Sequence, residues 1–403
     1  MKQFLFFLFL QILTSLYAQQ NLSDWKQLAL PDTVGSWILP AEGKPAMPVW
    51  GHANGIVIGL APLPGPRGLI RIYASYLEYE FPEVMNFIAF EPIPKGSNHR
   101  GFSELEVSSL DPEERGKRFW SSNDSTASLP SDPVYPARGV VEKINGEETL
   151  TLYVFSEPFD NGAKVYVRLR FFESRPYEFE ITTNTYNGSV NLDYFITTAT
   201  MGNKARLRTL FFKDGEKSSL NLWSGYKDIH FTPHECFSQQ EMIRSWKGGA
   251  YFIAAPNEKD YSKAEFAAGT NEHWKFTGKT ATQYWIQENP QEKLTGLVNG
   301  RFTYWASENP IPGGVSFENF ELKSPFKNGE QFVFGITPLP PQQFIQQIKT
   351  RPLGDVMVNE FNLNHNCKNE RQSQGIPKEN WVRHDRRDKY PRFYLGRKFI
   401  GIK

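Results

Sequence analysis

The chain has 403 residues, of which 39% are hydrophobic and 22% are charged. This composition excludes an intrinsically disordered chain, because disordered segments combine low hydrophobicity with a high net charge. With 45 basic and 44 acidic residues the formal net charge is +1, so no overall electrostatic attraction to nucleic acid is expected.

The first eighteen residues have the pattern of a secretory signal peptide. Lys2 precedes the apolar run 4–16, and Leu16-Tyr17-Ala18 resembles a cleavage site. No cysteine follows the expected cut, which argues against a lipid anchor. The rest of the sequence has no apolar run of about 18 residues, so no membrane-spanning helix is expected. The sequence therefore predicts a secreted or periplasmic protein.

Short β-prone runs alternate with turn residues from residue 55 to residue 340. Aromatic residues make up 15% of the chain and are typical of strands. Asn145-Gly146 stands between two β-prone runs, which is a strong hairpin signal, and Asp214-Gly215 repeats it. We predict an all-β fold, a large antiparallel β-sandwich of the jelly-roll or extended type over 55–340. Residues 19–54 are expected to form an N-terminal extension packed on its core.

One hairpin and one helix are expected in more detail. Residues 165–171 and 177–181 each alternate apolar with charged side chains, so arginines and glutamates should meet as cross-strand ion pairs. Pro341 to Lys349 has apolar residues at helical spacing and begins with proline, which suits the first turn of a helix. Residues 341–403 are thus expected to be one short helix followed by a basic, aromatic tail.

The sequence contains two cysteines, Cys236 and Cys367, each with a histidine two residues before it. A disulfide between them is the favoured expectation for an exported protein. Two buried thiols are the next alternative, and a zinc site made by two His-x-Cys pairs is the least favoured. No metal is therefore expected.

Sequence motifs for phosphate binding, dinucleotide binding, zinc proteolysis and serine hydrolysis are absent. No cofactor is expected, and acid–base chemistry is what the side chains offer. Two enzyme classes that act on extracellular polymers use acid–base chemistry. Polysaccharide lyases need a Tyr, His or Lys base and a group that neutralises a uronate, whereas glycoside hydrolases need two carboxylates.

The first candidate site is the polar loop around residue 99. Here His99 and Glu104 are the expected catalytic residues, with Asn98 and Arg100 as substrate-binding residues. A solvated surface loop is the alternative interpretation of the same residues.

The second candidate site is an aromatic segment that begins near residue 273. His273 and Tyr284 are the expected catalytic residues there, and ordinary aromatic packing is the alternative. The side chains expected to bind substrate are Trp274, Lys275, Gln283, Trp285, Arg301 and Trp305.

Residues 62–68 and 311–321 resemble segments of the large secreted β-sandwich proteins that bacteria encode with polysaccharide-degrading systems. The resemblance covers residues 50–340 and transfers no functional residues. It implies that the partner is a polysaccharide, and it leaves the oligomeric state open.

The leading expectation is a polysaccharide lyase that cleaves an acidic polysaccharide by base-catalysed elimination. The candidate bases lie beside Asn98, Arg100 and Lys275, which are groups that bind a uronate. One alternative is a glycoside hydrolase that pairs Glu308 with Glu318 or Glu321. The other is a noncatalytic glycan-binding or cell-envelope protein.

Overall fold

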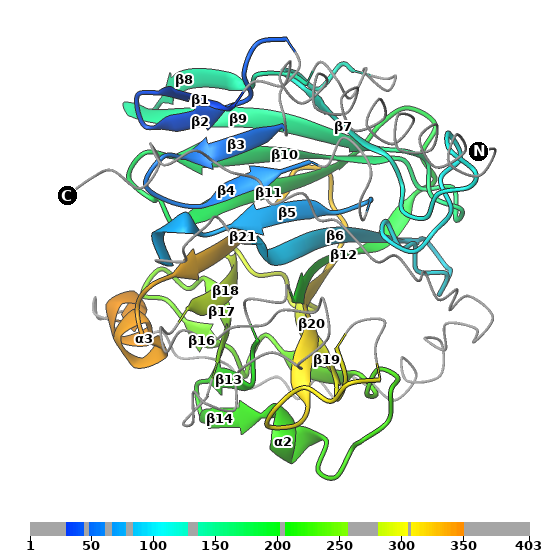
Figure 1. Cartoon of the computed structure of the whole chain (residues 1–403), viewed down its shortest axis with the longest axis vertical. Coiled ribbons are helices and arrows are strands. Elements are labelled where there is room, and N and C mark those ends of the chain that lie inside the picture. Colours follow the sequence, from blue (N-terminus) through cyan, green and yellow to red (C-terminus); the bar gives the residue numbers. More distant parts are fainter. Residues whose placement is uncertain are drawn as a thin grey trace, which may run out of the picture.

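Two large antiparallel β-sheets pack face to face and form the described part of the chain (Figure 1). The computed structural model describes residues 30–43, 48–60, 67–77, 84–127, 136–201, 206–256, 281–304 and 308–349. This arrangement confirms the predicted all-β sandwich. None of the described helices is long and apolar enough to cross a membrane.

The first sheet has ten strands. In spatial order they are β1 (Asp32–Val34), β2 (Trp37–Leu39), β3 (Val49–His52), β4 (Val57–Gly59), β5 (Ile70–Tyr73), β6 (Val84–Pro94), β12 (Leu192–Met201), β20 (Ser316–Pro325), β19 (Thr295–Arg301) and β15 (Glu235–Ser238). Strands β1 to β3 come from the segment 19–54, so the sheet begins about twenty residues before the expected boundary at residue 55.

The second sheet has eleven strands. The main path is β14 (Gly215–Ser218), β13 (Thr209–Phe212), β17 (Ala250–Ala255), β18 (Thr282–Gln287), β21 (Glu330–Thr337), β11 (Glu178–Thr185), β10 (Val165–Phe172), β9 (Glu147–Ser156) and β7 (Phe119–Ser122). Beside this path, β8 (Val140–Ile144) pairs with β9, and β16 (Ile243–Arg244) pairs with β17.

The hairpins follow the turn residues that the sequence contains. Asn145 and Gly146 connect β8 to β9, and both have positive φ, at 52° and 86°. Two consecutive residues in this conformation match the twist of the flanking strands. The hairpin of β10 and β11 carries the expected ion pair, since Nη2 of Arg168 lies 3.0 Å from Oε1 of Glu180.

Helices contribute little. Those in the described part of the chain are the 3₁₀ turn η1 (Ser75–Leu77) and the α-helices α2 (Ser219–Leu222) and α3 (Pro341–Lys349). The bounds of α3 confirm the helix expected after the last strand. The ring centroid of Phe344 on α3 lies 4.4 Å from that of Tyr284 on β18, so this helix covers the outer face of the second sheet.

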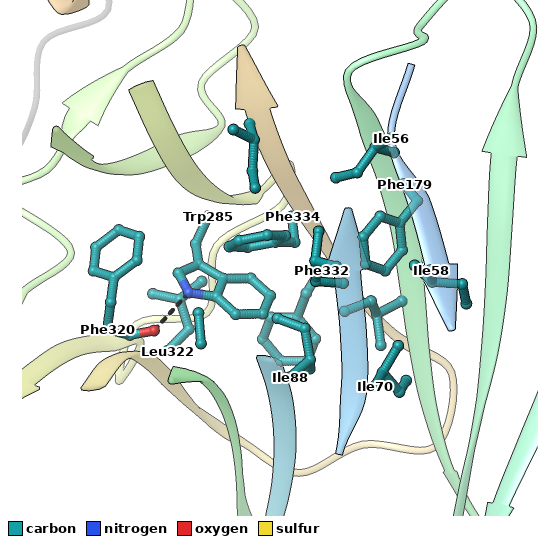
Figure 2. Close-up of a cluster of buried hydrophobic side chains, with 14 of the residues drawn as sticks. Ile56, Ile58, Ile70, Ile88, Phe179, Trp285, Phe320, Leu322, Phe332 and Phe334 are labelled. Carbon is teal, nitrogen blue, oxygen red and sulfur yellow. Dashed lines mark hydrogen bonds between the residues drawn. The ribbon is translucent and has the colours of Figure 1, made fainter. Parts of the chain in front are cut away.

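The main hydrophobic core lies between the two sheets and contains side chains from both (Figure 2). Trp285 of β18 is fully buried there, and its indole nitrogen donates a hydrogen bond of 2.8 Å to the carbonyl oxygen of Phe320 on β20. A second polar link joins the sheets, because the Asn86 amide donates to Oε1 of Gln283 at 2.6 Å. Two buried side-chain hydrogen bonds between the sheets hold the two layers in one relative position.

Candidate functional site

A group of ionisable side chains lies on the face of the first sheet that points away from the core. Along β6, Ile88 and Phe90 point into the core, so the alternation of the strand turns Glu91 outward. On β20, Phe320 and Leu322 are core residues and Glu321 is turned outward in the same way. Strand β12 lies between these two strands and places the Thr198 side chain between the two glutamates.

The chain after β6 folds back and brings Arg100 over this face. The backbone nitrogens of Gly101 and Ser103 donate to the carbonyl oxygens of Pro92 and Phe90, at 3.0 and 3.1 Å. These bonds are made by the end of β6 that does not pair with β5. They fix the position of the Arg100 backbone relative to the strand.

The Arg100 guanidinium joins the two outward-facing glutamates. Its Nε donates to Oε2 of Glu91, and its Nη2 donates to Oε1 of Glu321 at 2.8 Å. Thr198 also donates to Glu91, at 3.0 Å. Arg100 is 8% exposed, and its Nη1 has no hydrogen-bond partner among the described residues. A buried guanidinium nitrogen with no partner is a donor that a bound molecule can use.

A histidine and a second arginine complete the arrangement. Nε2 of His234, just before β15, lies 3.8 Å from Oε2 of Glu321 and 3.3 Å from the Asn299 amide. Nη1 of Arg301 lies 3.9 Å from Oε1 of Glu318. Glu318 has no partner across β19, because the register shifts there as in a β-bulge.

We call these residues the carboxylate cluster. It consists of Glu91, Glu104, Glu318 and Glu321 with Arg100, His234 and Arg301. Glu104 belongs to it because its carboxyl group interacts electrostatically with the three other glutamates and with Arg100.

The local environment separates the pKa values of these carboxyl groups. Burial, and then the charges of Glu91, Glu318 and Glu321, raise the pKa of Glu104 to about 8. Burial also raises the pKa values of Glu91 and Glu318 to about 7. Burial alone would raise the pKa of Glu321 as well, but Arg100 and His234 lower it to about 2. Carboxyl groups whose environments push their pKa values apart are suited to divided acid and base roles.

Glu104 differs from its neighbours in being only half-buried. Glu91, Glu318 and Glu321 are 3%, 7% and 0% exposed. Glu104 is therefore the carboxyl group in the cluster that a molecule from solution reaches most readily. At neutral pH its raised pKa leaves it protonated and able to donate a proton.

Five of the residues expected from the sequence meet in this cluster: Arg100, Glu104, Arg301, Glu318 and Glu321. Asn98 and His99 are exposed on the adjoining loop, and the His99 carbonyl accepts a bond of 2.9 Å from the Asn161 amide. Glu308, the expected partner of Glu318 or Glu321, is also exposed. In the loop around residue 99, Asn98 and His99 thus lie on the solvated surface, whereas Arg100 and Glu104 belong to the carboxylate cluster.

The residues expected on β18 lie elsewhere. Tyr284 lies under α3 on the outer face of the second sheet and donates to Oε2 of Glu178 at 2.9 Å. Burial, and then the Glu178 charge, raise the pKa of Tyr284 well above its usual value, which opposes a role as a base. Gln283 and Trp285 are both 0% exposed and point into the core. A fully buried ring has no face on which a sugar can stack, and the buried Gln283 amide is equally out of reach of a ligand. We therefore assign both residues to the core.

Other expected residues lie outside the described part of the chain. They are His273, Trp274, Lys275, Trp305 and Cys367. The predicted pairing of Cys236 with Cys367 therefore stays a prediction. Within the described residues, no three His, Cys, Asp or Glu side chains are placed to hold a metal ion.

Sequence reasoning missed Glu91 and considered His234 only as a zinc ligand. Glu91 had a signal, because it is the one charged residue in the largely apolar strand 85–93. A charged residue is seldom buried unless it is paired, so such a position indicates a partner elsewhere in the chain. His234 gave no comparable signal, since its neighbour Glu321 is 87 positions away in the sequence.

The fold and the cluster together define a two-sheet antiparallel β-sandwich with a carboxylate–arginine site on one outer face. A comparison of the sequence with protein family models and with curated proteins found no match.

Proposed function

We propose that this protein is a carbohydrate-active enzyme that hydrolyses glycosidic bonds at the carboxylate cluster. The observation that carries the proposal is the geometry in which Arg100 holds Glu91 and Glu321 and Arg301 lies near Glu318, with the half-buried Glu104 beside them. Glycoside hydrolysis requires a protonated carboxyl group to protonate the leaving oxygen and a second carboxylate on the other side of the bond.

The roles follow from exposure and charge. Glu104 donates the proton to the leaving oxygen. Glu318, whose Oε1 lies 3.9 Å from Nη1 of Arg301, supplies the second carboxylate once it is ionised, and a water molecule that adds to the sugar carbon replaces the leaving oxygen. The ionised Glu321, bound by Arg100, adds negative charge that stabilises a positively charged, oxocarbenium-like transition state.

The same electrostatics favour hydrolysis over the elimination that the sequence suggested first. Elimination needs a cation to neutralise the uronate carboxyl group. Arg100 and Arg301 already face Glu91, Glu321 and Glu318, so the positive charge of both guanidinium groups is engaged by carboxyl groups of the protein. A neutral sugar is therefore the better substrate at the point of cleavage.

The test is a panel of acidic and neutral polysaccharides incubated with the protein, with new reducing ends and ultraviolet absorbance followed together. We expect reducing ends without the absorbance of an unsaturated uronide. Glu104→Gln keeps the shape and removes the acid, so it should lower the rate by at least about a hundredfold. Because Glu318 must be ionised and Glu104 protonated, the wild-type rate should rise as the pH passes about 7 and fall as it rises through about 8.

The matched control is Glu113→Gln on an exposed turn, which should leave the rate unchanged. Absorbance from an unsaturated product would show elimination in place of hydrolysis. Equal rates for the two variants would remove Glu104 from the mechanism. The absence of product from every polymer would favour a binding protein without catalysis.

A further inference from the structure

A polar hollow lies at one edge of the sandwich, where two turns that connect the sheets meet. One turn joins β11 to β12 and the other joins β20 to β21. The hollow has a volume of about 580 Å³ and is lined by Lys95, residues 185–193 and residues 326–328. This size lies within the range of small-ligand sites.

Positive charge gathers around the hollow. Lys95 and Lys327 line it and are exposed. A third ammonium group, that of Lys164, lies against the first turn, because a Cβ atom on Gly188 would be 2.9 Å from its Nζ. Of the described residues that line the hollow, Asp193 alone is acidic, and its Oδ2 accepts a bond of 2.8 Å from the Gly96 nitrogen.

The rest of the lining is fixed in position. Oδ1 of Asn328 accepts a bond of 2.8 Å from the Thr185 nitrogen, which sets the plane of that amide. Tyr186 donates to the Ser156 carbonyl at 2.9 Å, and the Phe326 ring lies 6.1 Å from that of Phe195. Preorganised amides and aromatic rings beside cations are suited to a sugar that carries an anionic group.

The hollow and the carboxylate cluster adjoin the same strand. Lys95 is four residues after Glu91, which corresponds to about 13 Å along an extended chain. The exposed residues Asn98 and His99 lie in the chain between Lys95 and Arg100. A single extended polymer can therefore reach both places by passing along this loop.

We propose that the hollow is a binding subsite for an acidic sugar, a carboxylated or sulfated unit of the polymer that is cleaved at the cluster. This inference rests on the proposed function. It assigns recognition of negative charge to the lysines and leaves a neutral sugar at the point of cleavage. The expected acidic polysaccharide is then recognised at a distance from the bond that breaks.

The experiment measures binding by calorimetry with three probes: tetragalacturonate, a carrageenan tetrasaccharide and the neutral maltotetraose. It uses full-length protein carrying Glu104→Gln, so that no probe is cleaved. We expect at least one acidic probe to bind more tightly than maltotetraose. Adding Lys95→Gln and Lys327→Gln should weaken that binding about tenfold, because two cationic contacts are lost. Adding Lys213→Gln, on the exposed turn between β13 and β14, should leave it unchanged.

Binding of tetragalacturonate alone would identify a carboxylate subsite, and binding of the carrageenan probe alone a sulfate subsite. Equal binding of all three probes, binding of no acidic probe, or no effect of the two lysine substitutions would overturn the inference. The two proposals can fail separately. An enzyme whose cleavage rate is insensitive to Glu104→Gln would refute the proposed acid while the binding result still stands.

Discussion

Arg100 is the residue on which the geometry of the carboxylate cluster depends. It is almost fully buried and forms ion pairs with Glu91 and Glu321, which lie two strands apart. A charge in such a place is tolerated because each partner compensates the other, and removing one partner leaves the other unpaired in a poorly solvated site. Arg100 is therefore structural as well as part of the proposed site.

We expect Arg100→Met to lower the free energy of unfolding by about 3–5 kcal/mol, as measured by chemical denaturation. The control is Arg138→Met. Arg138 pairs with Asp32 at 2.7 Å, but its side chain is 33% exposed. Solvent screens that pair, so the loss should be at most about 1 kcal/mol. Equal losses in the two variants would contradict the compensating role of Arg100.

At the scale of the elements, β18 joins the two layers of the sandwich. Its inward-facing Trp285 donates a hydrogen bond to the carbonyl oxygen of Phe320 on the other sheet (Figure 2). The inward-facing Gln283 accepts one from the Asn86 amide of that sheet. The Trp285 ring also lies 4.8 Å from that of Phe334 on the neighbouring strand β21. A strand with these contacts is among the most constrained in the molecule.

Trp285→Ala should therefore destabilise the fold by about 3–5 kcal/mol, because it leaves a cavity between the sheets and removes the indole hydrogen bond to Phe320. Val141→Ala on the edge strand β8 is the control. Val141 is 40% exposed, so its loss should change stability by no more than about 0.5 kcal/mol. Thermal unfolding followed by circular dichroism measures both. A stable, unchanged Trp285→Ala variant would show that the ring does not hold the layers together.

Strand β18 also shows why sequence reasoning assigned site residues to a strand that is buried in the fold. Alternation puts Tyr284 on one face of the strand and Gln283 and Trp285 on the other, but both faces carry large or amide-bearing side chains. The pattern therefore does not say which face is buried, since that depends on the partner sheet and on α3. By contrast, the Asn145-Gly146 hairpin and α3 were predictable, because turn and helix signals are local.

At the scale of the whole molecule, the two sheets place distant segments of the chain together. The carboxylate cluster combines residues near positions 91–104, 234, 301 and 318–321, which only the strand order β6-β12-β20-β19-β15 brings side by side. Sequence alone offered Arg100, Glu104, Arg301 and the two glutamates of β20 as separate candidates. The sequence did not show that these residues lie together, because strand order in a large sandwich is set by long-range pairing.

The most direct test of this account is the titration of Glu104 itself. Glutamate carboxyl carbons can be labelled with ¹³C and followed by nuclear magnetic resonance as the pH changes, with Glu104→Gln used to assign the signal. We expect a carboxyl resonance that titrates near pH 8 and is missing from the variant. The raised pKa means that the group is mostly protonated at pH 7 and loses its proton as the pH rises past 8. A Glu104 signal that titrates near pH 4.5 would contradict the central claim, because the proposed acid would then be ionised at neutral pH.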